Sequence, residues 1–213
     1  MNISFRILSF LNVGVMSLRL LWDLDGTIFD TYPAILNSFC SVYEEVHGKS
    51  VDKKEALRWL KRTSKEAFAH FGISEDFRER FKVLDHAEAE AGSPPFNGIE
   101  SILAQAEINV IVTHRTRAST KELLVKWGLL QYFDEIVSPD DDGFPRKPDV
   151  AAYEYVHNKY QLEWAIGDRS LDLIPAKAVG MKTCAFQNED IEADLHIDAY
   201  TSSFLEKLKT GSE

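Results

Sequence analysis

The chain of 213 residues contains little cysteine and comparatively little positive charge. Its two cysteines, Cys40 and Cys184, stand alone and show no metal-binding spacing, so a reducing, cytoplasmic environment is the simplest expectation. Lysine and arginine together number 24 against 34 acidic residues, which gives a net charge of −10. Nucleic acid is therefore not an expected partner, because no basic stripe is present to neutralise its phosphates. An anionic small molecule stays open, since a metal and a few local cations can reverse the field inside a site.

Long hydrophobic runs are missing as well. Residues 3–16 are largely apolar, with Arg6 their only charge, but this stretch is too short to span a bilayer. No clear signal-peptide cleavage site follows it. We therefore expect no membrane partner and interpret residues 1–16 as an N-terminal extension ahead of an alternative start at Met16. A secretory signal and a packed extra strand or helix are the alternatives.

The apolar content of 45% is sufficient for a sizeable core. The length fits one domain, or a core domain with a small insert. A buried strand is expected over residues 18–22, and from Gly98 onward helix-like and strand-like patterns alternate. The later strands are expected at residues 108–112, 135–137, 164–166 and, as the final one, 182–186. This alternation predicts an α/β fold with a doubly wound parallel sheet and helices on both faces.

Between Asp30 and Pro94 the sequence carries no strand signal and is typical of helices only. Thr31 and Ser64 are expected to cap two of these helices, and in the later part Ser119 and Glu122 form an expected capping box. We call residues 31–95 the helical insert, because they interrupt the α/β pattern directly after the first strand. The predicted organisation is a core of residues 17–30 and 96–208, the helical insert, the extension 1–16, and a tail of residues 209–213.

The first expected strand ends on two acids, Asp23 and Asp25, separated by one residue. Side chains at i and i+2 of a strand lie on the same side, so both carboxylates can face one site if the strand continues that far. Two carboxylates at such a distance repel each other unless a cation neutralises them or one holds a proton. Gly26 then permits a sharp exit from the strand.

Polar and charged side chains also follow the other expected strands. Thr113 and His114 come after the second strand, Lys147 lies in the loop after the third, and Asp168 and Asp172 follow the fourth. Ligands of parallel α/β sheets bind at the carboxyl ends of the strands, so these groups are expected to converge on the acid pair. A hydroxyl, a cation and a metal held by carboxylates are the parts that phosphoryl transfer needs around its spreading negative charge.

The run Asp23-Leu24-Asp25-Gly26-Thr27 resembles the signature of the haloacid dehalogenase-like (HAD) hydrolase superfamily. With Thr113, Lys147 and the Gly167-Asp168-x-x-x-Asp172 run in order, the resemblance covers residues 17–208 and extends to the phosphoglycolate phosphatase-like branch, whose small helical C1 cap matches the helical insert. It implies a HAD-like Rossmannoid core and a phosphatase that hydrolyses a small phosphomonoester, such as a phosphoglycolate or a sugar phosphate, through an aspartyl-phosphate.

The same resemblance implies a role for each site residue. Asp23 is the nucleophile and Asp25 the general acid/base, while Thr113 and Lys147 hold the transferring phosphoryl group. Mg²⁺ is held by Asp23, the carbonyl of Asp25, Asp168 and Asp172. Residues expected to contact the substrate are Thr113, His114, Lys147 and, in a loop of the helical insert, Arg62 and Ser64. His114 departs from the Asn common at this position in the family.

Several alternatives stay open at this level. Thr113 can cap the following helix, Asp172 can be an exposed first-turn acid, and residues 61–64 can face solvent. Residues 140–142 are expected to form a solvated acidic loop. A hexose-phosphate mutase would use the same acids, and a non-catalytic phospho-acceptor or binding module is a further possibility. The expected partner is a small phosphorylated metabolite, and both a monomer and a homodimer are compatible with the sequence, which does not name the natural substrate.

Overall fold

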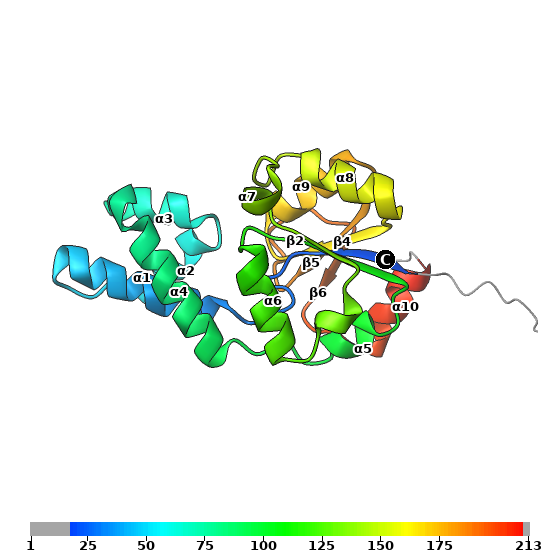
Figure 1. The fold of residues 1–213 in the computed structure, drawn as a ribbon, viewed down its shortest axis with the longest axis horizontal. Helices are drawn as coiled ribbons and strands as arrows, with labels where there is room; N and C mark the ends of the chain where they lie inside the picture. The colour runs from blue at the N-terminus through cyan, green and yellow to red at the C-terminus, as the bar shows by residue number, and fades with distance from the viewer. Residues whose placement is uncertain (1–17, 211–213) are drawn as a thin grey trace, which may run out of the picture.

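A six-stranded sheet with strand order β3-β2-β1-β4-β5-β6 forms the centre of the computed structural model, which describes residues 18–210 (Figure 1). Each pair of neighbouring strands runs parallel. The strands are β1 (Arg19–Trp22), β2 (Ile108–Val112), β3 (Glu135–Val137), β4 (Trp164–Gly167), β5 (Lys182–Phe186) and β6 (Leu195–Ile197). The predicted α/β fold with a parallel sheet is confirmed.

Strand β1 lies between β2 and β4 in the middle of the sheet, and its side chains are buried on both faces. Leu20 and Trp22 belong to the core on one face, whereas Leu21 belongs to the core on the other. This alternation follows from the period of two residues in a strand. The buried indole Nε1 of Trp22 donates to Asn109 Oδ1 at 2.9 Å, so the polar edge of this large side chain is satisfied.

Helices cover both faces of the sheet (Figure 1). One face packs against α5 (Ile99–Leu103), α6 (Arg117–Lys126) and α10 (Ser202–Thr210), with the 3₁₀ turn η2 (Leu130–Tyr132) beside them. The other face packs against α8 (Ala151–Tyr160) and α9 (Ser170–Ala178). The short helix α7 (Pro139–Asp142) follows β3. Two apolar layers therefore fix β1 and, with it, the position of the acids that follow it.

The helical insert projects to one side of the sheet in Figure 1 and has an apolar core of its own, which includes Phe39, Leu60, Phe68 and Phe81. Its elements are α1 (Tyr32–His47), α2 (Lys53–Leu60), α3 (Ser64–His70), the 3₁₀ turn η1 (Glu75–Phe77) and α4 (Arg78–Gly92). The chain leaves and re-enters the sheet region through two adjacent segments. Asp30 N donates to Pro94 O at 2.9 Å and Phe96 N donates to Ile28 O at 2.9 Å, so backbone hydrogen bonds join the two segments.

Three of the expected helix caps differ from those in the structure. Thr63, not Ser64, caps α3 by accepting from Glu66 N, and α6 is capped by Thr116, so the Ser119 box does not open it. Thr31 precedes α1 but makes no side-chain cap hydrogen bond. At α3 and α6 the residue that caps the helix lies one and three positions before the expected one.

Other differences concern the short elements. Strand β6 was not expected, because Leu195–Ile197 is too brief to show an alternating pattern and lies at the sheet edge. The acidic run after β3 forms α7 where a loop was expected, and α10 extends to Thr210, two residues into the expected tail of residues 209–213. The expected extension 1–16 lies outside the described residues. Within residues 18–210, no helix has the length and apolar character needed to cross a membrane.

Candidate active site

The acid pair stands where β1 leaves the sheet. Asp23 N donates to Ile166 O at 2.9 Å, so β1 continues its pairing with β4 for one more residue and places the Asp23 carboxylate in the interior, 1% exposed. Gly26 then turns the chain with φ of 80°. A Cβ at this position would lie 2.3 Å from Tyr32 Cε2 and 2.9 Å from Asp168 Oδ2, so both the backbone conformation and the space require glycine.

Lys147 is a fully buried cation of the site, where the Arg169 guanidinium also lies 3.5–3.8 Å from carboxylate oxygens of Asp23, Asp168 and Asp172. Its Nζ donates to Asp23 Oδ1 at 2.5 Å, to Asp172 Oδ1 at 2.6 Å and to Val112 O at 3.0 Å, which uses all three of its donors. Burial alone would lower the pKa of Lys147, but Asp172 and Asp23 outweigh burial and raise this pKa above its ordinary value. Lys147 is therefore a fixed positive charge against one oxygen of Asp23.

Asp23, Asp168 and Asp172 form a cluster in which one carboxylate oxygen of each lies within 4.8 Å of the others. Asp23 Oδ2 and Asp168 Oδ1 are buried and have no hydrogen-bond partner. Burial, together with the charge of Asp172, raises the pKa of Asp23 to about 6, and burial likewise raises the pKa of Asp168 to about 7. Buried carboxylate oxygens that accept no hydrogen bond and belong to acids with raised pKa values are the donor set that a hard divalent cation stabilises, so these residues fit such an ion.

Asp172 differs from the other two acids because both its oxygens already have protein donors. Its Oδ1 accepts from Lys147 Nζ at 2.6 Å and its Oδ2 accepts from Arg169 N at 3.2 Å. Burial opposes ionisation, but Lys147 and Arg169 outweigh it and lower the pKa of Asp172. Asp172 is 2% exposed, which excludes the alternative of a solvated first-turn acid. In the structure it anchors Lys147.

Thr113 and His114 follow β2 and face the same region. Thr113 N donates to Val137 O at 3.1 Å, and its hydroxyl accepts from Arg115 N at 3.1 Å. It does not cap α6, because that cap is Thr116. Burial and the positive charge of Lys147 lower the pKa of His114 to about 2, so its ring is neutral, and its Nε2 is buried without a hydrogen-bond partner.

Asp25 is held by a residue to which the sequence assigned no role. Arg115 donates to Asp25 Oδ1 through Nε at 3.2 Å and through an Nη at 3.0 Å. Burial would raise the pKa of Asp25, but Arg115 outweighs burial and lowers it. A cation two residues after Thr113 was the available signal, and its partner could not be read because it lies 90 positions away along the chain.

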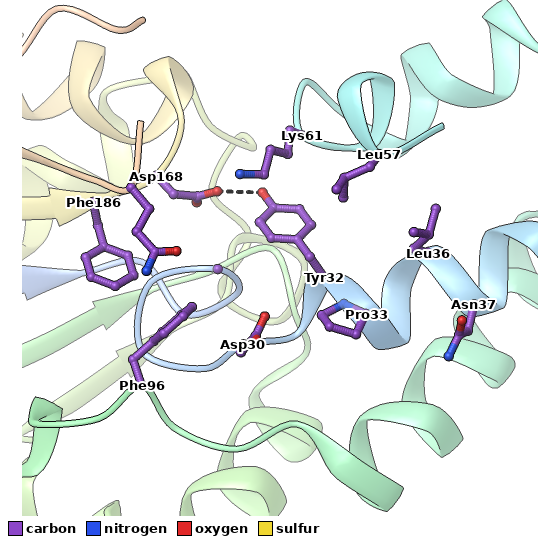
Figure 2. Close-up of a pocket in the computed structure, with 12 residues that line it drawn as sticks. Asp30, Tyr32, Pro33, Leu36, Asn37, Leu57, Lys61, Phe96, Asp168 and Phe186 are labelled. Atoms are coloured by element: carbon purple, nitrogen blue, oxygen red, sulfur yellow. Dashed lines mark hydrogen bonds between the residues drawn. The ribbon is translucent and has the colours of Figure 1, made fainter. Parts of the chain in front are cut away.

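A pocket of about 390 Å³ opens between the acid cluster and the helical insert (Figure 2). Tyr32 OH donates to Asp168 Oδ2 at 2.6 Å, and Lys61 Nζ lies 5.0 Å from the centroid of the Tyr32 ring. Apolar side chains come from both sides, since Pro33, Leu36 and Leu57 belong to the insert and Phe96 and Phe186 lie opposite. The remaining lining residues are Gly26, Asp30, Asn37 and Gln187.

The structure does not bring Arg62 or Ser64 into this pocket. Arg62 pairs with Glu66 at 2.8 Å on the surface and lies over the ring of Trp59, and Ser64 Oγ accepts from Arg78 at 2.8 Å. Their neighbour Lys61 lines the pocket instead. Within the expected loop of residues 61–64, a difference of one position therefore decides which side chain borders the pocket.

Comparison with known proteins agrees with this geometry. Residues 20–186 match the sequence model described as haloacid dehalogenase-like hydrolase. The chain belongs to this family. A pyrophosphatase PpaX of Halalkalibacterium halodurans is 27% identical over 184 residues, which cover 80% of this chain and 85% of that protein.

Solved structures of other proteins share the fold. A hydrolase from Streptococcus pneumoniae is 29% identical with a TM-score of 0.60, covering 81% of this chain and 94% of its own. A predicted phosphoglycolate phosphatase from Haemophilus somnus is 20% identical with a TM-score of 0.71, covering 88% and 96%. The expected family and the expected HAD-like core are therefore confirmed. The expectation that the chain is a hydrolase is confirmed as well.

Proposed function

We propose that this haloacid dehalogenase-like hydrolase is a Mg²⁺-dependent phosphatase that cleaves a small phosphomonoester through a phosphorylated Asp23. The observation that supports this most is the Asp23 carboxylate itself. Its Oδ1 is held by Lys147 at 2.5 Å while its Oδ2 is buried and unpartnered, at the edge of the sheet where ligands bind. A carboxylate fixed at one oxygen and free at the other is suited to nucleophilic attack.

In the first step, an oxygen of Asp23 attacks phosphorus, and the bond from phosphorus to the alcohol oxygen of the substrate breaks. Asp25 gives its proton to that oxygen, which leaves as the alcohol. Asp25 has a lowered pKa beside Arg115, so it is ionised in the substrate-free protein. A phosphate group entering beside it adds negative charge, which raises the pKa of Asp25 and lets it carry the proton.

In the second step, the Asp25 carboxylate takes a proton from water as the water oxygen attacks phosphorus. The bond between Asp23 and phosphorus breaks, which releases phosphate and restores the nucleophile. Lys147 stays against Asp23 and Asp172 throughout, while the Thr113 hydroxyl and the neutral His114 ring supply further polar contacts to the phosphoryl oxygens. These groups are buried and already oriented, so little reorganisation is needed when charge develops.

The metal ligands in this proposal are Asp23, Asp168 and the backbone carbonyl of Asp25, with Asp172 completing the acidic surroundings. When bound, Mg²⁺ supplies positive charge that offsets repulsion between these carboxylates and a phosphate. Asp168 Oδ1, which is buried without a hydrogen-bond partner, supports direct ligation by Asp168. Asp172 is the weaker candidate, because Lys147 and Arg169 already use its oxygens.

The pocket under the helical insert is the proposed place for the leaving group, so the insert serves as a cap. Its volume of about 390 Å³ accommodates a small organic phosphate. The lining is largely apolar, with Lys61 as a cation above the Tyr32 ring. This lining favours a compact leaving group with an anionic or polar end.

The direct test is phosphate release by the purified full chain from p-nitrophenyl phosphate, 2-phosphoglycolate, sugar phosphates and pyrophosphate, with Mg²⁺ and with excess EDTA. We expect turnover with Mg²⁺ and its loss in EDTA. Sustained turnover in EDTA would contradict the metal assignment. Isomerisation of a sugar phosphate without net phosphate release would favour the mutase, and failure on every phosphate with Mg²⁺ present would favour a silent binding module.

A further inference from the structure

Arg115 connects the proposed acid/base residue to the helical insert. Its side chain is 7% exposed, and its guanidinium donates through Nε and one Nη to Asp25 Oδ1. The same Nη lies 3.3 Å from Asp85 Oδ2, and Asp85 belongs to α4 of the insert. The other Nη donates to Ser119 Oγ of α6 at 3.2 Å. One buried side chain therefore contacts the site, the insert and the core.

Arg115 could hold Asp25 without contacting Asp85. The contact with Asp85 therefore needs a separate explanation. Asp85 side-chain exposure is 19%, and its Oδ1 is buried without a hydrogen-bond partner. A carboxylate on a surface helix is more stable in water than half-satisfied at an interface, so its placement here has a cost. Arg115 compensates this cost only while α4 stays against the core.

The helical insert is attached to the core through two adjacent chain segments, one at Asp30 and one at Pro94. Such an attachment lets the insert change its angle as a body, because its own apolar core stays intact. Away from the core, α4 would remove Asp85 from Arg115. Arg115 would then lose one of its two carboxylate partners and the restraint on its guanidinium plane.

We propose that Arg115 is a positioning residue that makes the orientation of the Asp25 carboxylate depend on whether α4 is docked. With α4 docked, Asp85 and Ser119 hold the guanidinium so that it grips Asp25 Oδ1 and leaves Oδ2 for the substrate or water. With α4 undocked, Asp25 lacks this fixed grip. Proton transfer is thereby confined to the state in which the insert covers the site. This inference rests on the proposed function, because it assigns Asp25 a proton-transfer role.

The test is a double-mutant cycle between Asp85→Asn and Asp25→Asn, with Glu88→Gln as the matched control. Glu88 is an exposed acid one turn further along α4. The readouts are kcat and KM on p-nitrophenyl phosphate with Mg²⁺, where the second step still needs Asp25 as a base. We expect Asp85→Asn to lower kcat about 10-fold with KM changed less than about 2-fold, and Glu88→Gln to match the wild type.

The decisive comparison is made in the Asp25→Asn background. There Asp85→Asn is expected to have no further effect on kcat, because the group that it positions is gone. A loss of the same factor in both backgrounds, or a rise in KM alone, would show a general structural role and overturn the inference. Wild-type kcat in Asp85→Asn would also overturn it.

Arg115→Lys provides a second route if Asp85→Asn folds poorly. Lysine keeps the charge but cannot contact two carboxylates with a planar fork, so we expect Arg115→Lys to lower kcat about 10-fold in the otherwise unchanged chain and to lower it no further in the Asp25→Asn background. Additive losses would contradict the link. An inactive wild type, or a fully active Asp25→Asn variant, would instead overturn the proposed function, so the two failures are distinguishable.

Discussion

The two sides of the candidate active site are built by different physics. One side is the row of carboxyl ends of the parallel strands, which we call the sheet edge in this comparison. There, Asp23, Lys147 and Asp172 are almost completely buried and joined by ion pairs of 2.5 and 2.6 Å. On the side of the helical insert, the pocket wall consists mostly of apolar side chains, with a few polar groups. One of these polar groups is the ammonium of Lys61, which lies over the Tyr32 ring. The first region has little freedom to move without exposing an uncompensated charge, whereas the second is held by non-directional packing.

This contrast suits the buried charges to the reaction step and the apolar pocket wall to the selection of the substrate. Buried charges in fixed positions can stabilise a developing charge with little reorganisation, which suits them to a reaction common to many substrates. An apolar wall tolerates substitution by other apolar residues at modest cost, so it can change from one relative to another without loss of the fold. We therefore expect mutations at the sheet edge to act on kcat and mutations in the pocket wall to act on KM.

The largest expected effect separates the two acids of the sheet edge. Asp23→Asn should lower turnover by on the order of 10⁴-fold or more, because an amide is a poor nucleophile. Asp25→Asn should lower it by about 10²–10⁴-fold, the range of general acid–base catalysis. With the good leaving group p-nitrophenolate the first step should suffer less than the second, so phosphorylated Asp23 should accumulate.

The measurement is mass spectrometry of the Asp25→Asn variant after rapid acid quench, followed by mapping of the phosphoryl label. Asp140→Asn, which alters an exposed acid paired with Arg146, is the control and should match the wild type. A label on another residue, or substantial turnover in Asp23→Asn, would show that Asp23 is not the nucleophile.

The sheet edge is also the part of the molecule that could be predicted from the sequence. Asp23, Thr113 and Asp168 each directly follow a strand, and Lys147 lies in the connection after β3, so strand order and the parallel rule bring them together. The sequence did not indicate that Lys147 Nζ would bind Asp172 as well as Asp23, because that contact depends on the path of a loop.

The pocket wall could not be predicted to the same degree. Its residues are scattered through α1, the end of α2, and the segments around Phe96 and Phe186, and only packing of the helical insert brings them together. Helical periodicity identifies which face of a helix is buried, but not whether its end turns toward a cavity. Lys61 and Arg62 illustrate this limit, since adjacent cations lie in different surroundings.

An effect of intermediate size is expected on the pH dependence of folding stability, and its source is the acid cluster of Asp23, Asp168 and Asp172. The pKa of Asp168 is raised from 3.8 to about 7 and that of Asp23 from 3.8 to about 6, chiefly by burial. Between pH 4 and 7 these two acids therefore bind more protons in the folded chain than in the unfolded chain, so their contribution to stability without metal should fall as the pH rises through this window and then level off. Mg²⁺ favours the ionised acids, so its stabilising effect should grow over the same range.

This prediction is checked by thermal unfolding from pH 5 to 8 with and without Mg²⁺. Metal at 100 times its dissociation constant adds about 2.7 kcal/mol, which is several degrees in a domain of this size. We expect the difference between the two midpoints to widen with pH and to shrink strongly in Asp168→Asn. A difference that is independent of pH would contradict the raised pKa values.

The smallest expected effect comes from the pocket wall and tests the comparison most directly. Lys61→Met keeps the apolar stem and removes the charge, and Arg62→Met makes the same change one residue away on the surface. If Lys61 binds the anionic end of the leaving group, KM for 2-phosphoglycolate should rise about 10-fold in Lys61→Met with little change in kcat. KM for p-nitrophenyl phosphate, whose leaving group has no anionic end, should change less than about 2-fold.

Arg62→Met should leave both substrates within about 2-fold of the wild type, because its ion pair with Glu66 is solvent-exposed and such pairs contribute little. Equal losses in the two variants would indicate that general charge attraction, rather than a specific contact, brings the substrate to the insert. A fall in kcat without a change in KM would place Lys61 with the sheet edge, and the division of the site into a reacting edge and a selecting wall would then be wrong. The ratio of KM values for the two substrates in Lys61→Met therefore decides whether the helical insert recognises the leaving group through Lys61.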